Sequence, residues 1–248
     1  MPNGDETAET TSAGDVAATP ELLMEYLRAE ECKNPEKERC CICLATAQQT
    51  AAIRAAIEEA LRRGAMVSES LGSTTVAHTV LTFRVSQALL QVYPSLASAR
   101  AEWLASEPIQ NAMRDGNAWN VAKIATVTFG ILDRGGQPHF ALLTTDEGPG
   151  FDLERVPNPN HEKYISGDSG RGLFGLNGYL QRLEGNAIYM PMKPESPRTN
   201  TLFIEVPLPS DVAQPIDLFR TWYANLLQVD EDLRRKHQKA ANSDDNNG

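Results

Sequence analysis

Cysteine is absent from the chain after residue 43, and all four cysteines, Cys32, Cys40, Cys41 and Cys43, lie close together near its beginning. Residues so placed cannot cross-link the rest of the chain, which excludes a disulfide-stabilised fold. The C-C-x-C run also lacks the paired C-x-x-C spacing of common zinc sites. We therefore interpret Cys40 and Cys43 as small buried side chains on one face of a helix.

Long hydrophobic runs are missing as well. The longest stretches without a charged residue (40–53, 70–83 and 85–99) contain Ser, Thr or Gln and fall short of the about 20 apolar residues that a membrane helix needs. The first residues are acidic and lack the basic start and apolar core of a secretory signal. We therefore expect a cytoplasmic protein with no membrane partner.

Basic charge is scarce, because 23 Lys and Arg stand against 33 Asp and Glu, which gives a net charge of −10. A negative surface opposes binding to polyanions, so nucleic acid is not expected as a partner. Hydrophobic residues make up 41% and charged residues 23% of the chain, which is typical of soluble globular proteins and excludes a wholly disordered or fibrous chain.

The pattern of apolar residues predicts an α/β protein. We expect a disordered tail over 1–18, a helical or regulatory extension over 19–90, a central domain over 91–210, and a C-terminal helix with a flexible tail over 211–248. Helices are predicted at about 19–27, 35–63, 96–113, 173–183 and 215–238, and strands within 67–85, 121–132, 139–145, 188–191 and 201–206.

Two glycine-rich segments carry the chemical information. The first, DEGPGFD over 146–152, follows a predicted strand, and the second, GDSGRGLFGL over 167–176, opens a predicted helix. Glycines let the backbone turn sharply and approach a ligand closely, and free N–H groups at a helix start can bind phosphate oxygens. Each segment alone is weak, because turns and helix starts use glycine anyway. Their succession in this order favours a nucleotide site.

Upstream of these segments, Glu107 and Asn111 stand four residues apart in EPIQNAMRDGN and so share one face of a helix. An Asn carbonyl oxygen is a suitable ligand for Mg²⁺ on a triphosphate, and a carboxylate one turn earlier can orient or deprotonate an attacking hydroxyl. An ordinary solvated helix face would explain the same pair.

Together the three segments resemble the GHKL ATPase superfamily and, within it, the RsbW-like anti-sigma-factor serine kinases. The resemblance covers roughly 95–207. The family's first box, E-x-x-x-N-A, is matched by EPIQNA with a following DGN, its second box, D-x-G-x-G-F, by DEGPGF, and its third, G-x-G-L, by GRGL. It implies a two-layer α/β sandwich of the Bergerat (GHKL ATP-binding) type, with a mixed, mostly antiparallel sheet and helices on one face.

The resemblance also implies roles for single residues, with the segment 152–169 as an ATP lid. The implied positions are Glu107 as catalytic base, Asn111 as Mg²⁺ ligand, Asp146 and Thr201 at adenine, Gly148 and Gly150 along the nucleotide, and Gly170, Arg171, Gly172 and Leu173 at the phosphates. Arg171 is equally consistent with a solvated loop residue. The implied activity is transfer of the ATP γ-phosphate to a serine of an anti-anti-sigma (STAS-type) partner by a protein that also sequesters a sigma factor and can form a homodimer.

Three departures from the family pattern keep other interpretations open. Pro108 follows the implied base directly and would kink its helix, and Asp115 stands where a basic residue is common. On the last strand, Asn200 stands before Thr201 where the family usually has Gly. A non-catalytic, ATP-dependent or degenerate binding module is therefore the alternative. A histidine-kinase fragment is a further one, with His78 as the phosphate acceptor, although too few residues separate His78 from the first box for the usual dimerisation hairpin.

Overall fold

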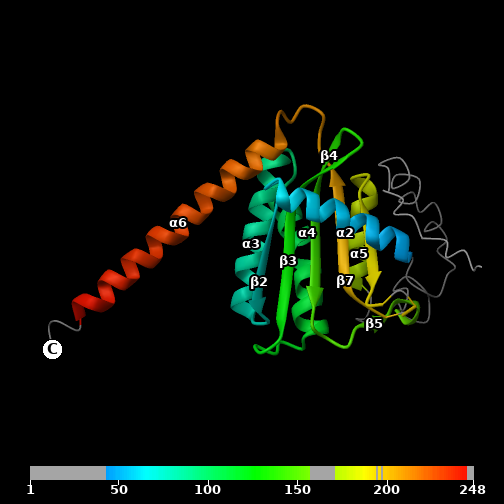
Figure 1. Cartoon of the computed structure of the whole chain (residues 1–248), viewed down its shortest axis with the longest axis horizontal. Coiled ribbons are helices and arrows are strands. Elements are labelled where there is room, and N and C mark those ends of the chain that lie inside the picture. Colours follow the sequence, from blue (N-terminus) through cyan, green and yellow to red (C-terminus); the bar gives the residue numbers. More distant parts are fainter. Residues whose placement is uncertain (1–42, 157–170, 194, 197, 245–248) are drawn as a thin grey trace, which may run out of the picture.

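The computed structural model describes residues 43–156, 171–193, 195–196 and 198–244. Within them the chain forms one open, mostly antiparallel sheet of the order β1-β6-β7-β4-β3-β2, with β5 added on β7 (Figure 1). The strands are β1 (Cys43–Leu44), β2 (Met66–Gly72), β3 (Ile124–Arg134), β4 (Gln137–Asp146), β5 (Phe151–Asp152), β6 (Asn186–Pro191) and β7 (Arg198–Pro207). β1 runs parallel to β6, and the remaining described pairs are antiparallel, which confirms the predicted α/β class with a mixed, mostly antiparallel sheet.

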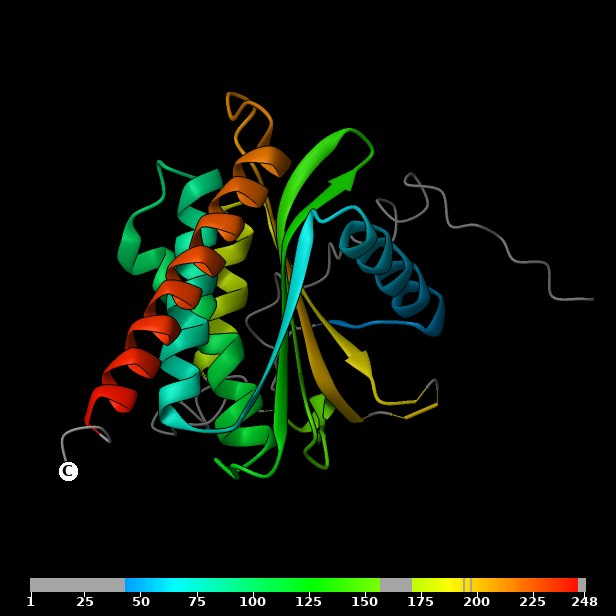
Figure 2. The ribbon, with the colours of Figure 1, turned by 60° about the vertical axis from the view of Figure 1, so that its left-hand side comes forward.

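The helices cover both faces of this sheet. They are α2 (Ala47–Arg62), α3 (Thr75–Val92), α4 (Ser98–Gln110), the π-helix η1 (Asn111–Gly116), the short 3₁₀ helix η2 (Leu153–Arg155), α5 (Arg171–Arg182) and α6 (Pro215–Asp244). Figure 2 shows α3, α4, α5 and α6 on one side of the sheet and α2 alone on the other. The expectation that all helices lie on one face is therefore wrong for α2.

The second layer exists because the central strands bury side chains on both faces. Side chains alternate along a strand, so Ile131 and Leu132, which are adjacent in β3, point to opposite faces, and both are buried. Ile131 packs with the larger core under α3 and α4, whereas Leu132 joins Phe203 and the α2 residue Ile53 in a second core. Strands with two apolar faces need a cover on each.

Two predicted element boundaries are wrong near the beginning of the described chain. The predicted strands over 67–85 end with β2 at Gly72, because the Thr74 hydroxyl accepts a hydrogen bond from Ala77 N at 3.0 Å and so starts helix α3. The helix predicted over 35–63 begins only at Ala47, where Thr46 and Gln49 form a capping box. Cys43 therefore lies in strand β1 and not on a helix face.

The described part of the expected extension over 19–90, residues 43–90, shares the sheet and the core with the rest of the described chain. β2 pairs with β3 from Met66 to Gly72, and α3 contributes Leu81, Val85 and Leu89 to the larger core. Among the described residues, each hydrophobic core therefore contains residues from both sides of the predicted boundary at residue 90. The predicted tail 1–18, the helix at 19–27 and Cys32, Cys40 and Cys41 lie outside the described residues.

The remaining predicted elements correspond to α4, β3, β4, α5, β6, β7 and α6, with shifts of a few residues at their ends. None of the helices in the described ranges combines the length and hydropathy that crossing a bilayer requires.

Candidate functional site

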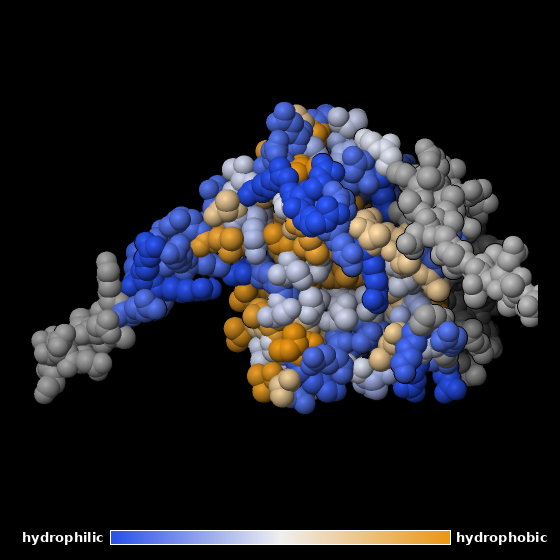
Figure 3. Space-filling view, in the orientation of Figure 1, coloured by the Kyte–Doolittle hydropathy of each residue, from blue (hydrophilic) through white to orange (hydrophobic). Residues whose placement is uncertain are grey.

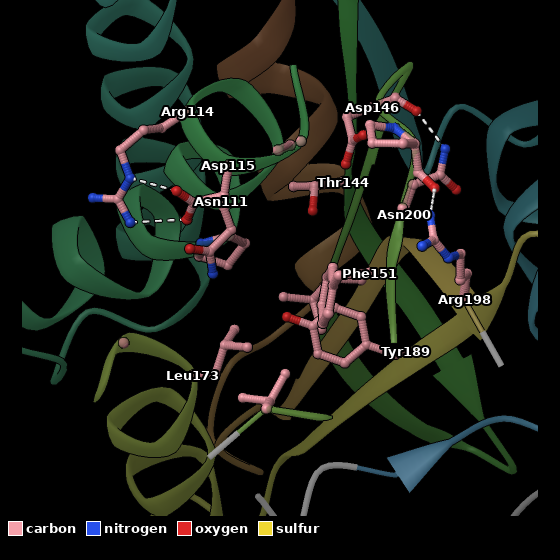
Figure 4. A pocket seen from close by; sticks show the side chains of 18 of the residues that line it. Asn111, Arg114, Asp115, Thr144, Asp146, Phe151, Leu173, Tyr189, Arg198 and Asn200 are labelled. Carbon is pink, nitrogen blue, oxygen red and sulfur yellow. Dashed lines mark hydrogen bonds and ion pairs between the residues drawn. The ribbon is translucent and has the colours of Figure 1, made fainter. Parts of the chain in front are cut away.

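A cavity of about 920 Å³ opens on the sheet face that carries α4 and α5. Its wall combines the end of α4, the π-helix, the ends of strands β4 and β7, the segment after β4, and the start of α5 (Figure 4). It is lined by Glu107, Pro108, Asn111, Ala112, Arg114, Asp115, Gly116, Thr144, Asp146, Pro149, Gly150, Phe151, Asp152, Arg155, Val156, Gly172, Leu173, Tyr189, Arg198, Asn200 and Leu202. The Glu-Asn motif and the two glycine-rich segments lie far apart in the sequence. All three therefore contribute residues to the same cavity.

The first motif lies where α4 changes into the π-helix. Glu107 and Asn111 both line the cavity, and Pro108 is accommodated inside α4, so the proline does not turn Glu107 away from it. Burial raises the pKa of Glu107 above its ordinary value, while Arg114 acts in the opposite direction. The amide nitrogen of Asn111 is buried and has no hydrogen-bond partner among the described residues. A buried amide without a partner points to a polar ligand or water in the cavity.

The second motif places a carboxylate at the end of strand β4. Asp146 is buried, and burial raises its pKa to about 6, although a hydrogen bond from Gly148 N and the charge of Lys123 act to lower it. Gly116 packs so closely on this carboxylate that a Cβ atom there would overlap it. Gly148 likewise leaves no room for a side chain beside Gly116 O. The two glycines therefore let the π-helix and the β4 end close around one acidic group.

The third motif reaches the cavity through the first turn of α5. Gly172 and Leu173 line it, and a Cβ atom on Gly172 would overlap the Glu107 carboxylate. The structure thus brings the predicted base and the predicted phosphate-binding turn into contact. Gly170 and residues 157–169 of the segment predicted as a lid, 152–169, lie outside the described residues, and of Arg171 only the backbone is described. Gly150, at the other end of that segment, has φ +66° and lines the cavity.

Thr201 does not line the cavity. Its neighbours Asn200 and Leu202 do, so the alternation of β7 turns Thr201 to the opposite face. There its hydroxyl lies 3.3 Å from the hydroxyl of Thr145. The cavity side is occupied instead by Thr144 and by Asn200, whose amide donates to Asp146 O at 2.5 Å. The prediction that Thr201 supports ligand recognition directly is therefore not matched by its position.

Asn117 is a positioning residue that the sequence analysis missed. It is fully buried after the π-helix, and its amide donates to Ser73 Oγ and Ile124 O, each at 2.9 Å. Its carbonyl oxygen accepts from Glu147 N at 2.9 Å. One side chain thus joins the start of α3, the start of β3 and the end of β4 next to Asp146. The sequence offers only the Asp-Gly-Asn run as a signal, which does not distinguish a ligand contact from such a brace.

The cavity wall carries further side chains that the motifs did not indicate. Arg114 forms a paired contact with Asp115, at 2.8 Å for each of two hydrogen bonds, and Arg198 donates to Pro149 O at 3.2 Å. Tyr189 and Phe151 meet edge to face with ring centroids 5.2 Å apart. The wall therefore offers cations, anions and a flat apolar surface, which suits a ligand with both an aromatic ring and charged groups.

His78, the residue that a histidine kinase would phosphorylate, lies between two helices. Its Nε2 is 3.2 Å from Ser106 Oγ of α4, and its ring meets Trp119 edge on at 6.1 Å. A half-buried ring with these neighbours is poorly placed to accept a phosphoryl group.

The oxygen atoms of Glu107 and Asn111 suit a cation that is held mainly by a bound phosphate ligand and only partly by the protein. No cluster of three or more His, Cys, Asp or Glu side chains that could hold a metal occurs among the described residues. Mg²⁺ on a triphosphate commonly keeps several waters and takes only one or two protein oxygens, and Asn111 and Glu107 offer such oxygens. The described residues therefore fit an Mg²⁺ ion that a polyphosphate ligand brings with it.

A scan of the chain against models of known protein families found no match, and a search of curated proteins found no match either.

Proposed function

We propose that this protein binds Mg²⁺-ATP in the cavity and acts as a GHKL-type serine kinase of the RsbW-like, anti-sigma kind. One observation carries the proposal: the three segments that resemble the family's boxes, far apart in the sequence, all contribute residues to a single cavity. As an ATP-dependent regulator it would work in the cytoplasm. Its partners would be a sigma factor and an antagonist protein of the STAS type that carries the acceptor serine.

The adenine end of the ligand is assigned to Asp146. A buried carboxylate packed against Gly116 and Gly148 can accept a hydrogen bond from an exocyclic amine. Thr144 and Asn200 flank this position on the cavity side of the strands. They take the place that the sequence resemblance gave to Thr201.

The phosphate end is assigned to the α4–α5 side. The first turn of α5 contributes Gly172, and its backbone N–H groups favour anions. Asn111 would supply an oxygen to the Mg²⁺ that ATP brings with it, which balances phosphate charge. Arg114, which is paired with Asp115 in this structure, is a cation that lines the same cavity.

The transfer step follows from the position of Glu107. The serine hydroxyl oxygen of the partner forms a bond to the γ-phosphorus as the bond between that phosphorus and the bridging oxygen of the ADP leaving group breaks. Glu107 accepts the proton of the hydroxyl, and its raised pKa makes it a better base than an exposed carboxylate. Its contact with Gly172 keeps the base beside the phosphate-binding turn.

The first test is a calorimetric titration of the purified chain with ATP and Mg²⁺. We expect saturable binding that is lost in Asp146→Ala and retained in Glu107→Gln, because the second change removes the base and keeps the side-chain volume. Asp211→Asn, an exposed acid outside the cavity, is the matched control. No binding by the unaltered chain would refute the proposal.

The second test separates a kinase from a non-catalytic switch. Once an acceptor partner is in hand, radiolabelled ATP should label it on serine with the unaltered chain and not with Glu107→Gln. Binding of ATP with no transfer by the unaltered chain to any STAS-type partner that it binds would favour the switch module.

A further inference from the structure

The C-terminal helix α6 begins against the body of the molecule and then projects away from it (Figure 1). Its first half is anchored, because Phe219 is fully buried and stacks on Tyr223 with ring centroids 6.2 Å apart. Among the described side chains, the last ion pair of α6 with the body joins Asp230 to Arg84 of α3 at 2.5 Å. Beyond Asp230, the hydrogen bonds and ion pairs of the described side chains stay within the helix itself.

The apolar stripe of α6 continues past the point where the helix leaves the body. Its members recur at alternating spacings of three and four residues: Phe219, Trp222, Leu226, Val229 and Leu233. This is the spacing of a coiled-coil seam. Phe219 is covered by the body, whereas Val229 is 55% and Leu233 49% exposed. The same face therefore packs inside the chain at one end and lies open at the other.

The charges on the two sides of Leu233 have opposite signs. Three acidic residues, 230–232, precede it, and three basic residues, 234–236, follow it. If two α6 helices meet antiparallel about a two-fold axis at Leu233, each acidic run lies opposite the basic run of the other helix. A parallel arrangement would set like charges against each other. Pairs within one helix, such as Glu231 with Arg235, also use this order, but they leave Val229 and Leu233 exposed.

Helix α3 extends the open apolar surface next to the departing half of α6. Phe83, directly before the Arg84 that binds Asp230, is 57% exposed, and Val76, two turns earlier, is 71% exposed. Figure 3 shows apolar side chains on the body on this side, close to the projecting helix. A second helix lying along α6 could cover part of this surface as well.

We propose that the projecting half of α6 is a dimerisation arm whose partner is a second copy of this chain. The two arms pair antiparallel through Val229 and Leu233, with the acidic and basic runs in contact across a two-fold axis. This inference does not depend on the proposed kinase activity. A binding surface that is complementary to itself in both apolar pattern and charge order fits a symmetric dimer.

The test is a pair of complementary charge swaps in the full-length chain. Glu231→Arg with Asp232→Arg makes the two residues on each side of Leu233 basic, and Arg234→Glu with Arg235→Glu makes them acidic. Asp230 stays unchanged, because it binds Arg84. Each swapped chain alone should dissociate at concentrations about tenfold or more above those at which the unaltered dimer does, because like charges then face each other. An equimolar mixture of the two should form the dimer again.

Sedimentation equilibrium at high micromolar concentration measures the result, and circular dichroism checks that the helices persist. Leu233→Glu should also abolish the dimer, whereas Leu227→Glu should not, because Leu227 is equally exposed (48% against 49%) but lies off the stripe. An unaltered chain that stays monomeric would overturn the proposal. So would a dimer that both swapped chains and Leu233→Glu leave intact, since the interface would then lie elsewhere.

Discussion

At the scale of single residues, Asp146 gives the clearest expectation because its environment opposes its charge. Its pKa rises from 3.8 to about 6 on folding, so the folded chain binds the proton more tightly than the unfolded one. The stability contributed by this group therefore falls as the pH rises from about 4 to about 6 and is lowest at neutral pH. A functional carboxylate that costs stability is typical of a binding site.

Asp146→Asn should therefore stabilise the protein at neutral pH while abolishing Mg²⁺-ATP binding. A pKa rise of this size corresponds to about 3 kcal/mol, and solvent screening reduces the expected gain to about 1–2 kcal/mol. The gain should vanish near pH 4, where the wild-type carboxyl is protonated. Urea unfolding of both chains across this pH range measures it, with Asp211→Asn as the exposed control. A loss of stability at neutral pH would contradict the assigned environment.

Gly172 and Gly178 provide a matched pair in the same helix, α5. A methyl group on Gly172 would overlap the Glu107 carboxylate, whereas nothing lies within 4 Å of the Cβ position of Gly178. Gly178→Ala should raise stability by up to about 1 kcal/mol through helix propensity alone. Gly172→Ala should displace the Glu107 side chain and lower phosphotransfer by about a hundredfold, because small misplacements of a catalytic group are costly. Thermal unfolding and transfer assays separate the two effects, and equal behaviour of the two variants would argue against the contact.

At the scale of elements, the sequence predicted well wherever the periodicity was long. The β3–β4 hairpin, α4, α5 and the last strand lie close to their predicted places because each has a clear apolar period. The stretch after Gly72 was predicted as strand because Thr and Val favour strands locally. It forms helix α3 instead, because Thr74 caps the helix and the helix packs against the sheet. The helix that became α2 was predicted, but its place on the opposite face of the sheet was not, because the pattern of a single strand does not show that both faces of the sheet are covered.

The candidate site was predictable to the level of motifs and not of side-chain direction. Glu107, Asn111, Asp146, Gly150, Gly172 and Leu173 line the cavity as expected. Thr201 itself does not line the cavity, but its neighbours Asn200 and Leu202 do, because successive side chains of a strand point to opposite faces. The family pattern does not fix which of these neighbouring residues faces inward. Asn117 was missed because its partners come from three elements that are distant in the sequence.

Replacing Pro108 tests how much free energy of unfolding the proline inside α4 costs. The proline lacks the N–H that would bind the carbonyl of Leu104, and an interior proline costs about 3 kcal/mol relative to alanine. Pro108→Ala should therefore raise the free energy of unfolding by about 1–2 kcal/mol, since the smaller side chain loses some buried contacts. Mg²⁺-ATP affinity should stay within about threefold, because Glu107 and Asn111 already face the cavity.

The turn residue Pro94 is the control for this substitution, because it is exposed and lies between α3 and α4. Pro94→Ala should lower stability by less than about 1 kcal/mol through greater freedom of the unfolded chain. Equilibrium unfolding and calorimetry measure both variants. A large rise in phosphotransfer on Pro108→Ala would mean that the proline holds Glu107 away from its working position.

At the scale of the whole molecule, the cavity proposed to bind nucleotide and the proposed dimer arm lie on different parts of the structure. The cavity lies over β4 and β7 between α4 and α5, whereas α6 packs on α3 and β3 and then projects away. A dimer formed through the arms would leave both cavities accessible to a partner protein. Nucleotide binding and dimerisation should therefore be separable by mutation.

Truncation of the arm tests this separation. A chain that ends after Asp230 keeps the Arg84 contact and the anchored half of α6, so it should fold and bind Mg²⁺-ATP with unchanged affinity. Its melting temperature should be independent of concentration, whereas that of the full chain should rise with concentration, as mass action requires for a dimer. A chain that ends after Val229 differs by one residue and should lose about 1 kcal/mol with the ion pair. If the melting temperature of the Asp230 chain still rose with concentration, the subunits would have to meet through another surface.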